Sequence, residues 1–299
     1  MNRTPRVDAH QHFWRLADRQ GHWPPPALAA IHRDFTPADF EPLRDRAGID
    51  ATVLVQSMPS EQETRELLRI AHEHAFVHGV VGWVDMKAAD APQRIDALAA
   101  DPLLKGLRPM LQDLPADDWI ADSAVDPASR AMQRHHLVFE ALVMPRHLAA
   151  LEAFASRHGE LQVVIDHGAK PSIATGEIDA WRAAMARLAG LPHVACKMSG
   201  LLTEARPRGT VEDLLPYVQT LWELFGPQRL VWGSDWPVLR LVDDYQAWLD
   251  MSVALLDAVA PSATATERAA VLGGNAVRLY RLDTPGVRTH GSHPASIPC

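Results

Sequence analysis

The sequence predicts a single-domain (β/α)8 barrel, a TIM barrel of the α/β class, on three observations. Short apolar runs alternate with longer amphipathic segments along the whole chain. Eight such runs occur in 299 residues, and barrels of this kind reach about 250 residues as one domain. The runs are almost continuously apolar, as in the strands of a parallel sheet that helices cover on the outside.

Each predicted strand is short and rich in Val, Ile and Leu. In chain order the runs are Val7–His10, Ala51–Gln56, Val77–Val84, Lys105–Leu111, Leu137–Val143, Leu161–Asp166, His193–Met198 and Arg229–Gly233. An open doubly wound sheet is the alternative fold. It would place a glycine-rich turn after the first strand, where this chain has Gln11, His12 and Phe13, so the barrel is favoured.

Helix-start signals lie between the strands. Thr36 and Pro37 predict an N-cap followed by proline at the first helical position. The segment Ser60–Glu63 matches a capping box. Four further helices are expected over Pro145–Phe154, Glu177–Leu188, Val211–Phe225 and Asp243–Val259.

No linker or internal repeat divides the chain, so we expect one barrel domain over residues 1–282. Residues 283–299 lack apolar periodicity and are expected to form a loose tail, in which His290 and His293 have no role.

The charge pattern argues against nucleic acid or membrane partners. The chain carries 29 Lys and Arg against 37 Asp and Glu, a net charge of −8, with no basic cluster. No run approaches the ~20 apolar residues that cross a bilayer, and the polar N-terminus is unlike a signal peptide. We therefore expect a cytoplasmic protein with a small-molecule substrate; a homo-oligomer is compatible with the sequence.

Two cysteines, Cys196 and Cys299, allow neither a disulfide framework nor a cysteine-rich zinc site. Any metal must therefore be held by histidine and carboxylate groups. Fifteen histidines are available for this purpose, and their placement is the informative feature.

The first strand ends in a His-x-His pair, His10 and His12. Residues two apart at the end of a strand face the same side, so these rings can converge at the mouth where barrel active sites lie. A second pair, His72 and His74, lies in a helical segment, where residues two apart point in different directions. We therefore expect a function for the first pair and none for the second.

Polar residues also follow the sixth and eighth strands. The sixth strand runs into Asp166, His167 and Gly168, and the eighth into Ser234 and Asp235. Structural caps are the alternative for each residue, but the carboxyl ends of barrel strands meet at one mouth. His10, His12, His167 and Asp235 are therefore the expected catalytic residues.

Two mechanisms remain open for three imidazoles and one carboxylate. The four residues can hold one Zn²⁺-like ion that polarises a carbonyl, with Asp235 near the attacking water. Without metal, the imidazoles can donate hydrogen bonds to an oxyanion while Asp235 acts as general base. Both mechanisms hydrolyse a bond at a carbonyl carbon.

Further residues at strand ends are expected to bind substrate. Arg108, after the fourth strand, suits a carboxylate or a pair of hydroxyls, although a surface ion pair is the alternative. The other candidates are Gln56, Trp83, Lys170, Lys197, Ser199 and Trp236. For the tryptophans, packing in the core is the alternative.

Five blocks, DAHQHFW, GLRPMLQD, VIDHGAKP, CKMSGLLTEA and RLVWGSDWPV, together resemble the sugar-lactonase-like branch of the amidohydrolase superfamily, which includes fucono-, rhamnono- and galactonolactonases. The resemblance covers about residues 6–282. It implies a (β/α)8 barrel that hydrolyses a cyclic ester, with the family's histidines and aspartate at His10, His12, His167 and Asp235. It also implies that Arg108 contacts substrate.

Departures from the wider superfamily limit the metal content that the resemblance implies. The fifth strand has no histidine at its end, and the fourth has no lysine or glutamate that could bridge two ions. A binuclear centre is therefore not expected. The sequence is compatible with one divalent ion, preferably zinc, and equally with no metal. Pro109 stands where some fuconolactonases have a histidine, which leaves the particular sugar open.

Two alternatives to a lactonase remain. One is a metal-dependent decarboxylase, or another amidohydrolase acting on a small carboxylic acid. The other is a non-catalytic sugar-acid-binding barrel, which would have no need for a general base beside three imidazoles.

Overall fold

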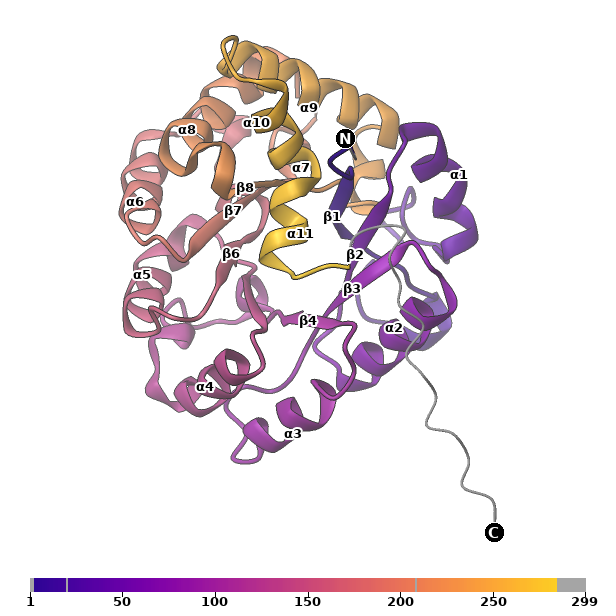
Figure 1. Cartoon of the computed structure of the whole chain (residues 1–299), viewed down its shortest axis with the longest axis vertical. Coiled ribbons are helices and arrows are strands. Elements are labelled where there is room, and N and C mark those ends of the chain that lie inside the picture. Colours follow the sequence, from indigo (N-terminus) through magenta and orange to yellow (C-terminus); the bar gives the residue numbers. More distant parts are fainter. Residues whose placement is uncertain (1–2, 20, 208, 284–299) are drawn as a thin grey trace.

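The computed structural model describes residues 3–19, 21–207 and 209–283, which form a barrel of eight parallel strands surrounded by helices (Figure 1). The strands are β1 (Val7–Gln11), β2 (Ala51–Val55), β3 (Val77–Gly82), β4 (Leu104–Leu107), β5 (Val138–Ala141), β6 (Val163–Ile165), β7 (Val194–Met198) and β8 (Leu230–Trp232). They follow one another around the sheet in chain order. The predicted (β/α)8 barrel is confirmed, and each predicted run overlaps one strand.

Backbone hydrogen bonds just beyond β8 join it to β1. The N–H of Asp235 donates to the carbonyl of His10, and the N–H of His12 donates to the carbonyl of Trp236, both at 2.8 Å. These bonds lie at the carboxyl ends of both strands. They therefore bring Asp235 beside the two histidines of β1.

Helices cover the outside of the barrel and its amino-terminal end (Figure 1). They are α1 (Pro37–Ala47), α2 (Glu61–Glu73), α3 (Ala91–Leu98), α4 (Asp126–Arg134), α5 (Leu148–Arg157), α6 (Asp179–Ala189), α7 (Leu201–Glu204), α8 (Val211–Arg229), α9 (Tyr245–Val259), α10 (Ala265–Ala269) and α11 (Asn275–Leu279). No individual start signal predicted α3, α4, the short α7 or the C-terminal pair α10 and α11.

The predicted helix starts are mostly confirmed. Thr36 precedes α1, and the hydroxyl of Ser60 accepts the N–H of Glu63 at 3.2 Å at the start of α2. The expected helix at Pro145 begins instead as a 3-10 turn, Pro145–His147, which leads into α5. The helix expected from Glu177 starts at Asp179.

The amino-terminal end of the barrel is closed by α11, which lies across the opening in Figure 1. Its Asn275 donates to the carbonyl of Leu230 at the start of β8. Small and β-branched side chains fill the interior above it: Val7, Ala9, Val53, Val81, Val138, Val164, Ala195 and Val231 pack with Ala276, Leu279 and Tyr280. The opposite end stays available for a site.

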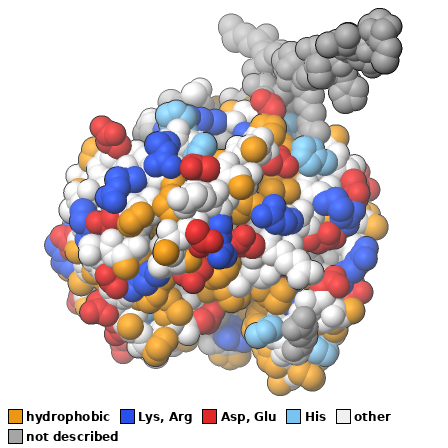
Figure 2. Space-filling view, turned by 90° about the horizontal axis from the view of Figure 1, so that it is seen from below, with side chains coloured by type: hydrophobic (Ala, Val, Ile, Leu, Met, Phe, Trp, Pro, Cys, Tyr) orange, Lys and Arg blue, Asp and Glu red, His pale blue; other side chains and the backbone are white. Residues whose placement is uncertain are grey.

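On the face shown in Figure 2, basic side chains are interspersed with acidic ones. Within the described ranges, no helix combines the length and apolar character that a membrane crossing requires. Most of the expected tail, residues 284–299 with His290 and His293, lies outside the described residues.

Candidate active site

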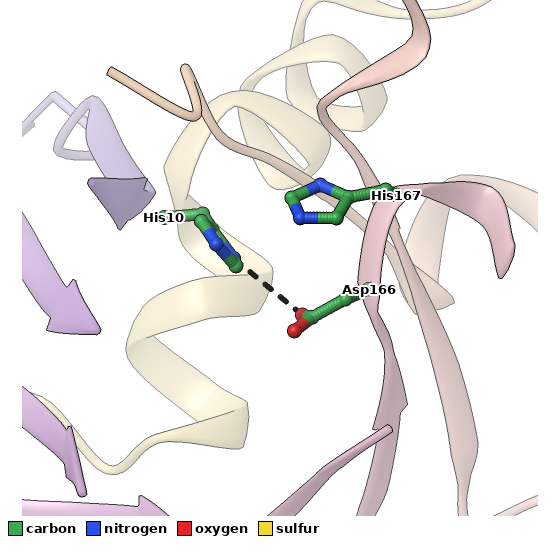
Figure 3. A group of neighbouring side chains, drawn as sticks. All are labelled: His10, Asp166 and His167. Carbon is green, nitrogen blue, oxygen red and sulfur yellow. Dashed lines mark ion pairs between the residues drawn. The ribbon is translucent and has the colours of Figure 1, made fainter. Parts of the chain in front are cut away.

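Four predicted residues meet at the mouth of the barrel around one carboxylate oxygen. The Oδ1 atom of Asp235 lies 3.3 Å from Nε2 of His12, 3.7 Å from Nε2 of His10 and 3.9 Å from Nε2 of His167. All four side chains are buried. His10 and His167 lie beside one another, with ring centroids 4.5 Å apart (Figure 3). Strands β1, β6 and β8 thus bring together groups that are far apart in the sequence.

A left-handed backbone turn presents His167. Residues His167, Gly168, Ala169 and Lys170 have φ values of +53°, +58°, +62° and +50°. Residues other than glycine rarely adopt this backbone conformation, because it strains the chain. Backbone strain of this kind is concentrated at functional sites. Asp235 is also left-handed, with φ +58°. The two strand ends that complete the cluster therefore both carry backbone strain.

Two residues after β7 hold the ring of His167. The hydroxyl of Ser199 lies 2.9 Å from Nδ1 of His167. Gly200 has φ +61°, and a Cβ atom there would lie 2.5 Å from the same Nδ1. Glycine is therefore required at this position both by the backbone and by the close approach of the imidazole.

His12 has a defined tautomer. Its Nδ1 lies 2.7 Å from the carbonyl of Val55, which can only accept, so Nδ1 carries the proton and donates. The neutral ring then has a lone pair on Nε2, which faces the carboxylate of Asp235 at 3.3 Å. Two electron-rich atoms at this distance are stabilised by a proton or a metal cation between them.

Burial and charge set the ionisation of the cluster. Burial, reinforced by Lys197, holds the pKa of His10 well below its usual range. Burial also lowers the pKa of His167 to about 4. For Asp235, burial would raise the pKa, but His167, the hydrogen bond with His12, and His10 more than offset it, so the pKa lies below the ordinary value. At neutral pH the site therefore holds an ionised Asp235 beside neutral His10 and His167.

A buried network of charges lies inside the barrel beside His10. Arg108 donates from Nη1 to Asp166 at 3.2 Å, and its Nη2 donates to the carbonyl of Gln56. Lys197, which is fully buried, lies 3.1 Å from Asp166 and donates to Glu140 at 2.6 Å. Each cation is thus balanced by carboxylates, as burial of charge requires.

The other predicted substrate-binding residues differ in how deeply they are buried. Gln56 is buried and donates from Nε2 to the carbonyl of Arg108 at 2.7 Å. Lys170 lies at the mouth, half-buried, with Nζ 3.9 Å from the carboxylate of Glu204. Trp83 is half-buried just after β3. Contact between these residues and substrate stays a prediction.

Trp236 and Lys197 are both fully buried. Trp236 is 1% exposed and packs among Phe13, Phe35 and Phe40. Lys197 is 0% exposed and is paired with carboxylates. Trp236 thus packs in an aromatic cluster and Lys197 lies beside His10; contact of either residue with substrate stays a prediction.

The second histidine pair has the separate contacts expected of a helix surface. Nε2 of His72 lies 2.8 Å from Asp101, whereas Nδ1 of His74 lies 3.3 Å from Glu41. The two rings contact different carboxylates, as residues two apart on a helix are expected to do.

The sequence interpretation missed two buried acids that support the site. Asp8 accepts the N–H of His10 at 3.1 Å and the N–H of Ser234 at 2.9 Å, which ties β1 to the segment after β8. Glu140, on β5, accepts from Lys197 and from the hydroxyl of Tyr280. Charged residues inside otherwise apolar strands were the available signal, because a buried charge needs a partner.

The residues suit a single cation better than two. Two overlapping groups, His10–His12–Asp235 and His10–Asp166–His167, have ligand atoms within 4.8 Å of one another. Asp166 is already paired with Arg108 and Lys197, whereas Asp235 faces imidazoles. The donor set of nitrogen and oxygen atoms around Asp235, with the lone pair of His12 directed at it, fits an ion such as Zn²⁺.

The family model and the related proteins that match this chain agree with one another. The amidohydrolase family model matches residues 7–282. An L-fucono-1,5-lactonase of Burkholderia ambifaria is 53% identical over 291 residues, covering 96% of this chain and 99% of its own length. An L-fucono-1,5-lactonase of Burkholderia multivorans is 38% identical and covers 94% of this chain and 97% of its own length.

Solved structures agree with this similarity. An amidohydrolase from Burkholderia multivorans, solved once with bound HEPES and once with bound zinc, is 35% identical with a TM-score of 0.85, over 93% of this chain and 100% of its own. A 2,6-dihydroxybenzoate decarboxylase shares only the fold, at 13% identity and a TM-score of 0.65 over 94% of this chain and 99% of its own.

Proposed function

Because the chain belongs to the amidohydrolase family, we propose that it hydrolyses the cyclic ester of a sugar lactone. The observation that carries this proposal is the convergence of three imidazole Nε2 atoms on one oxygen of Asp235. The identity to two L-fucono-1,5-lactonases supports a 1,5-lactone of a deoxy sugar acid as the first substrate to test. Decarboxylation is not favoured, since the likeness to decarboxylases is confined to the fold.

Asp235 acts as the general base in the proposed mechanism. Its pKa lies below the ordinary value, so the carboxylate is ionised at neutral pH and can accept a proton from water. The water oxygen attacks the lactone carbonyl carbon and gives a tetrahedral oxyanion. The bond to the ring oxygen then breaks, and Asp235 returns the proton to that oxygen, which leaves an open-chain hydroxy acid.

The imidazoles and Arg108 supply the electrostatic environment. A neutral imidazole donates a hydrogen bond to a developing oxyanion only from the nitrogen that carries its proton, and such a contact is worth about 3–4 kcal/mol in barrier height. The proton of His12 is donated to the carbonyl of Val55, so this role belongs to His10 and His167. Arg108 is held by Asp166 and by the carbonyl of Gln56, so its guanidinium is preorganised to orient substrate. Ser199 holds the ring of His167 in place.

We propose His10, His12, His167 and Asp235 as the candidate ligands of one divalent ion, with zinc the preferred metal. Support comes from their ligand geometry and from the zinc bound in the Burkholderia multivorans amidohydrolase. When bound, such an ion polarises the lactone carbonyl as a Lewis acid.

The decisive experiment measures acid release from L-fucono-1,5-lactone in weakly buffered solution, alongside other aldonolactones and muconolactones. Asp235→Asn is expected to lower kcat by at least 100-fold, because the amide cannot accept the proton of water. Asp250→Asn, at an exposed position, serves as the matched control and is expected to keep wild-type kcat.

Two results would contradict the proposal. One is near-wild-type lactone hydrolysis by a folded Asp235→Asn variant. The other is a wild-type protein whose melting temperature rises when lactones are added but which hydrolyses none of them. A protein that only binds its ligand would behave in this way.

A further inference from the structure

We propose that Lys170 and Glu204 form a hydroxyl-binding pair at the mouth of the barrel, and that this pair selects neutral, polyhydroxylated lactones over lactones that carry a carboxylate. The inference rests on the proposed function and names the substrate class of that site. It adds Glu204 to the residues expected to contact substrate. Lys170 and Glu204 bind the same hydroxyl group of the sugar ring.

Both side chains come from the two turns that hold the ring of His167. Lys170 ends the left-handed turn that presents His167, and its N–H donates to the carbonyl of His167 at 2.8 Å. Glu204 ends α7, the short helix that follows Gly200. A Cβ atom at Gly200 would lie 2.5 Å from Nδ1 of His167, so the two turns lie against one another. Lys170 and Glu204 therefore stand on the backbone that builds the catalytic cluster.

The charges of the pair act on the catalytic residues. Burial raises the pKa of the Glu204 carboxyl; Lys170 partly offsets this rise, and the negative charge of Asp235 adds to it. Burial lowers the pKa of His167, and the positive charge of Lys170 acts in the same direction. Charges act on one another in this way only over short distances, about 8–10 Å at moderate ionic strength. Glu204 therefore lies near Asp235, and Lys170 lies near His167.

The two charged groups face each other without forming a direct hydrogen bond. Nζ of Lys170 lies 3.9 Å from Oε1 of Glu204, and the two side chains are 22% and 27% exposed. Direct contacts of this kind close to about 2.7–2.9 Å, and the buried pair Lys197–Glu140 is 2.6 Å apart. Within the described ranges, neither the Lys170 ammonium nor the Glu204 carboxylate takes part in a hydrogen bond. Both groups therefore keep hydrogen-bonding capacity for a ligand.

A hydroxyl group matches the separation of the two charges. An oxygen atom about 2.8 Å from both Nζ and Oε1 spans the 3.9 Å between them, with an angle of about 90° at that oxygen. A hydroxyl accepts from the ammonium group and donates to the carboxylate at the same time. The second oxygen of Glu204 can then accept from a neighbouring hydroxyl. Two adjacent hydroxyls of a sugar lactone therefore fit the chemistry of the pair.

Glu204 supplies the discrimination against charged substrates. Lys170 by itself would attract a substrate carboxylate as well as a hydroxyl. A carboxylate has no proton to donate to Glu204 at neutral pH, and it meets the negative charges of both Glu204 and Asp235. Contact between like charges in a partly buried site is costly. We therefore expect kcat/KM to be higher for a neutral aldonolactone than for the lactone of a sugar diacid or a muconolactone.

The test compares a neutral aldonolactone with the lactone of the matching sugar diacid at pH 7. Glu204→Gln keeps the size of the side chain and removes its charge. We expect this variant to lower kcat/KM for the neutral lactone, mainly through KM, and to change the ratio of the two kcat/KM values at least fivefold toward the diacid lactone. Glu212→Gln, at an exposed position of α8, is the matched control and should keep the ratio within twofold. A change of less than fivefold in Glu204→Gln would overturn the proposal.

A series of deoxy lactones, each lacking one ring hydroxyl, tests whether both groups bind the same hydroxyl. One member of the series should lose its sensitivity both to Lys170→Met and to Glu204→Gln, because the group that the two residues bind is missing from it. A double-variant protein should add no further loss for that member. If sensitivity to the two variants is lost in different members, or in none, the shared contact is wrong.

Binding without turnover separates this inference from the proposed function. In Asp235→Asn protein, calorimetry measures the Kd of the neutral lactone. Addition of Glu204→Gln should raise this Kd at least fivefold, and addition of Glu212→Gln less than twofold.

If the wild-type protein hydrolyses no lactone, the same comparison is made in the wild-type background. The expected rise in Kd then supports the pair although the proposed function fails. A smaller rise, or no binding of the neutral lactone, would overturn the inference about the pair. Lactone hydrolysis whose selectivity is unchanged in Glu204→Gln would overturn this inference alone and leave the proposed function standing.

Discussion

At the scale of single residues, the chemistry of the site depends on which neighbour each imidazole contacts. His10, His12 and His167 are all buried and all face Asp235, yet their outer nitrogens contact an ammonium group, a carbonyl and a hydroxyl. Hydrogen-bond chemistry therefore distinguishes rings that share one type and one location.

The pKa of His167 predicts how stability depends on pH. Its value of about 4 in the folded protein lies below the ordinary 6.5, so between these values the unfolded chain binds more protons than the folded one. The free energy of unfolding should therefore decrease as the pH falls from 6.5 to 4. The contribution of this group is up to roughly 3 kcal/mol at about 1.4 kcal/mol per pH unit.

Urea unfolding of metal-free protein at pH 7 and pH 5 checks this prediction. His167→Asn should show a smaller loss of stability between the two values than the wild-type protein. His72→Asn, which alters a surface ion pair with Asp101, is the control and should follow the wild type. Identical losses in the wild type and His167→Asn would show that this imidazole is not the group responsible.

At the scale of elements, the turns after β6 and β7 must fit together. The left-handed turn from His167 to Lys170 directs the imidazole toward Gly200, which has no side chain to obstruct it. Neither turn could adopt its conformation independently, because the ring occupies the space that a Cβ atom at position 200 would need.

Gly200→Ala is expected to reduce both stability and activity. Alanine in a left-handed conformation costs about 1–2 kcal/mol, and the collision with His167 adds about 1–3 kcal/mol. Displacement of the ring should also lower kcat at least tenfold. Gly176→Ala is a matched control, since Gly176 has φ +71° but no described atom within 4 Å of an added Cβ. Equal destabilisation by the two variants in urea unfolding would exclude the collision.

At the scale of the whole molecule, the two ends of the barrel have different tasks. The carboxyl ends of the strands hold the charged site, and α11 seals the opposite end with apolar side chains. This division is general among barrels, where stability and chemistry reside at opposite faces. Here Glu140 and Tyr280 connect the two ends through one hydrogen bond.

Gly273→Ala should destabilise the barrel as a unit. An added Cβ would lie 2.0 Å from the carbonyl of Pro5 and 2.8 Å from the N–H of Val7, where the chain enters β1. We expect a loss of about 1–3 kcal/mol in the free energy of unfolding, because backbone atoms must move apart. At Gly274 the nearest atom is the methyl group of Thr4, 3.3 Å away, so Gly274→Ala should cost under about 1 kcal/mol. A smaller loss for Gly273→Ala than for Gly274→Ala would contradict this packing.

The sequence by itself determined the eight strands, the helix starts at Thr36 and Ser60, and the four side chains that meet at the mouth. These features follow from local periodicity, capping chemistry and the rule that parallel strands share a carboxyl edge. Tertiary structure alone decided that Lys197 lies behind His10 and that Tyr280 reaches Glu140. A charged residue in an apolar strand indicates that it has a buried partner. The identity of that partner cannot be predicted from the strand itself, because the partner lies on another strand or helix that only the closed barrel brings near.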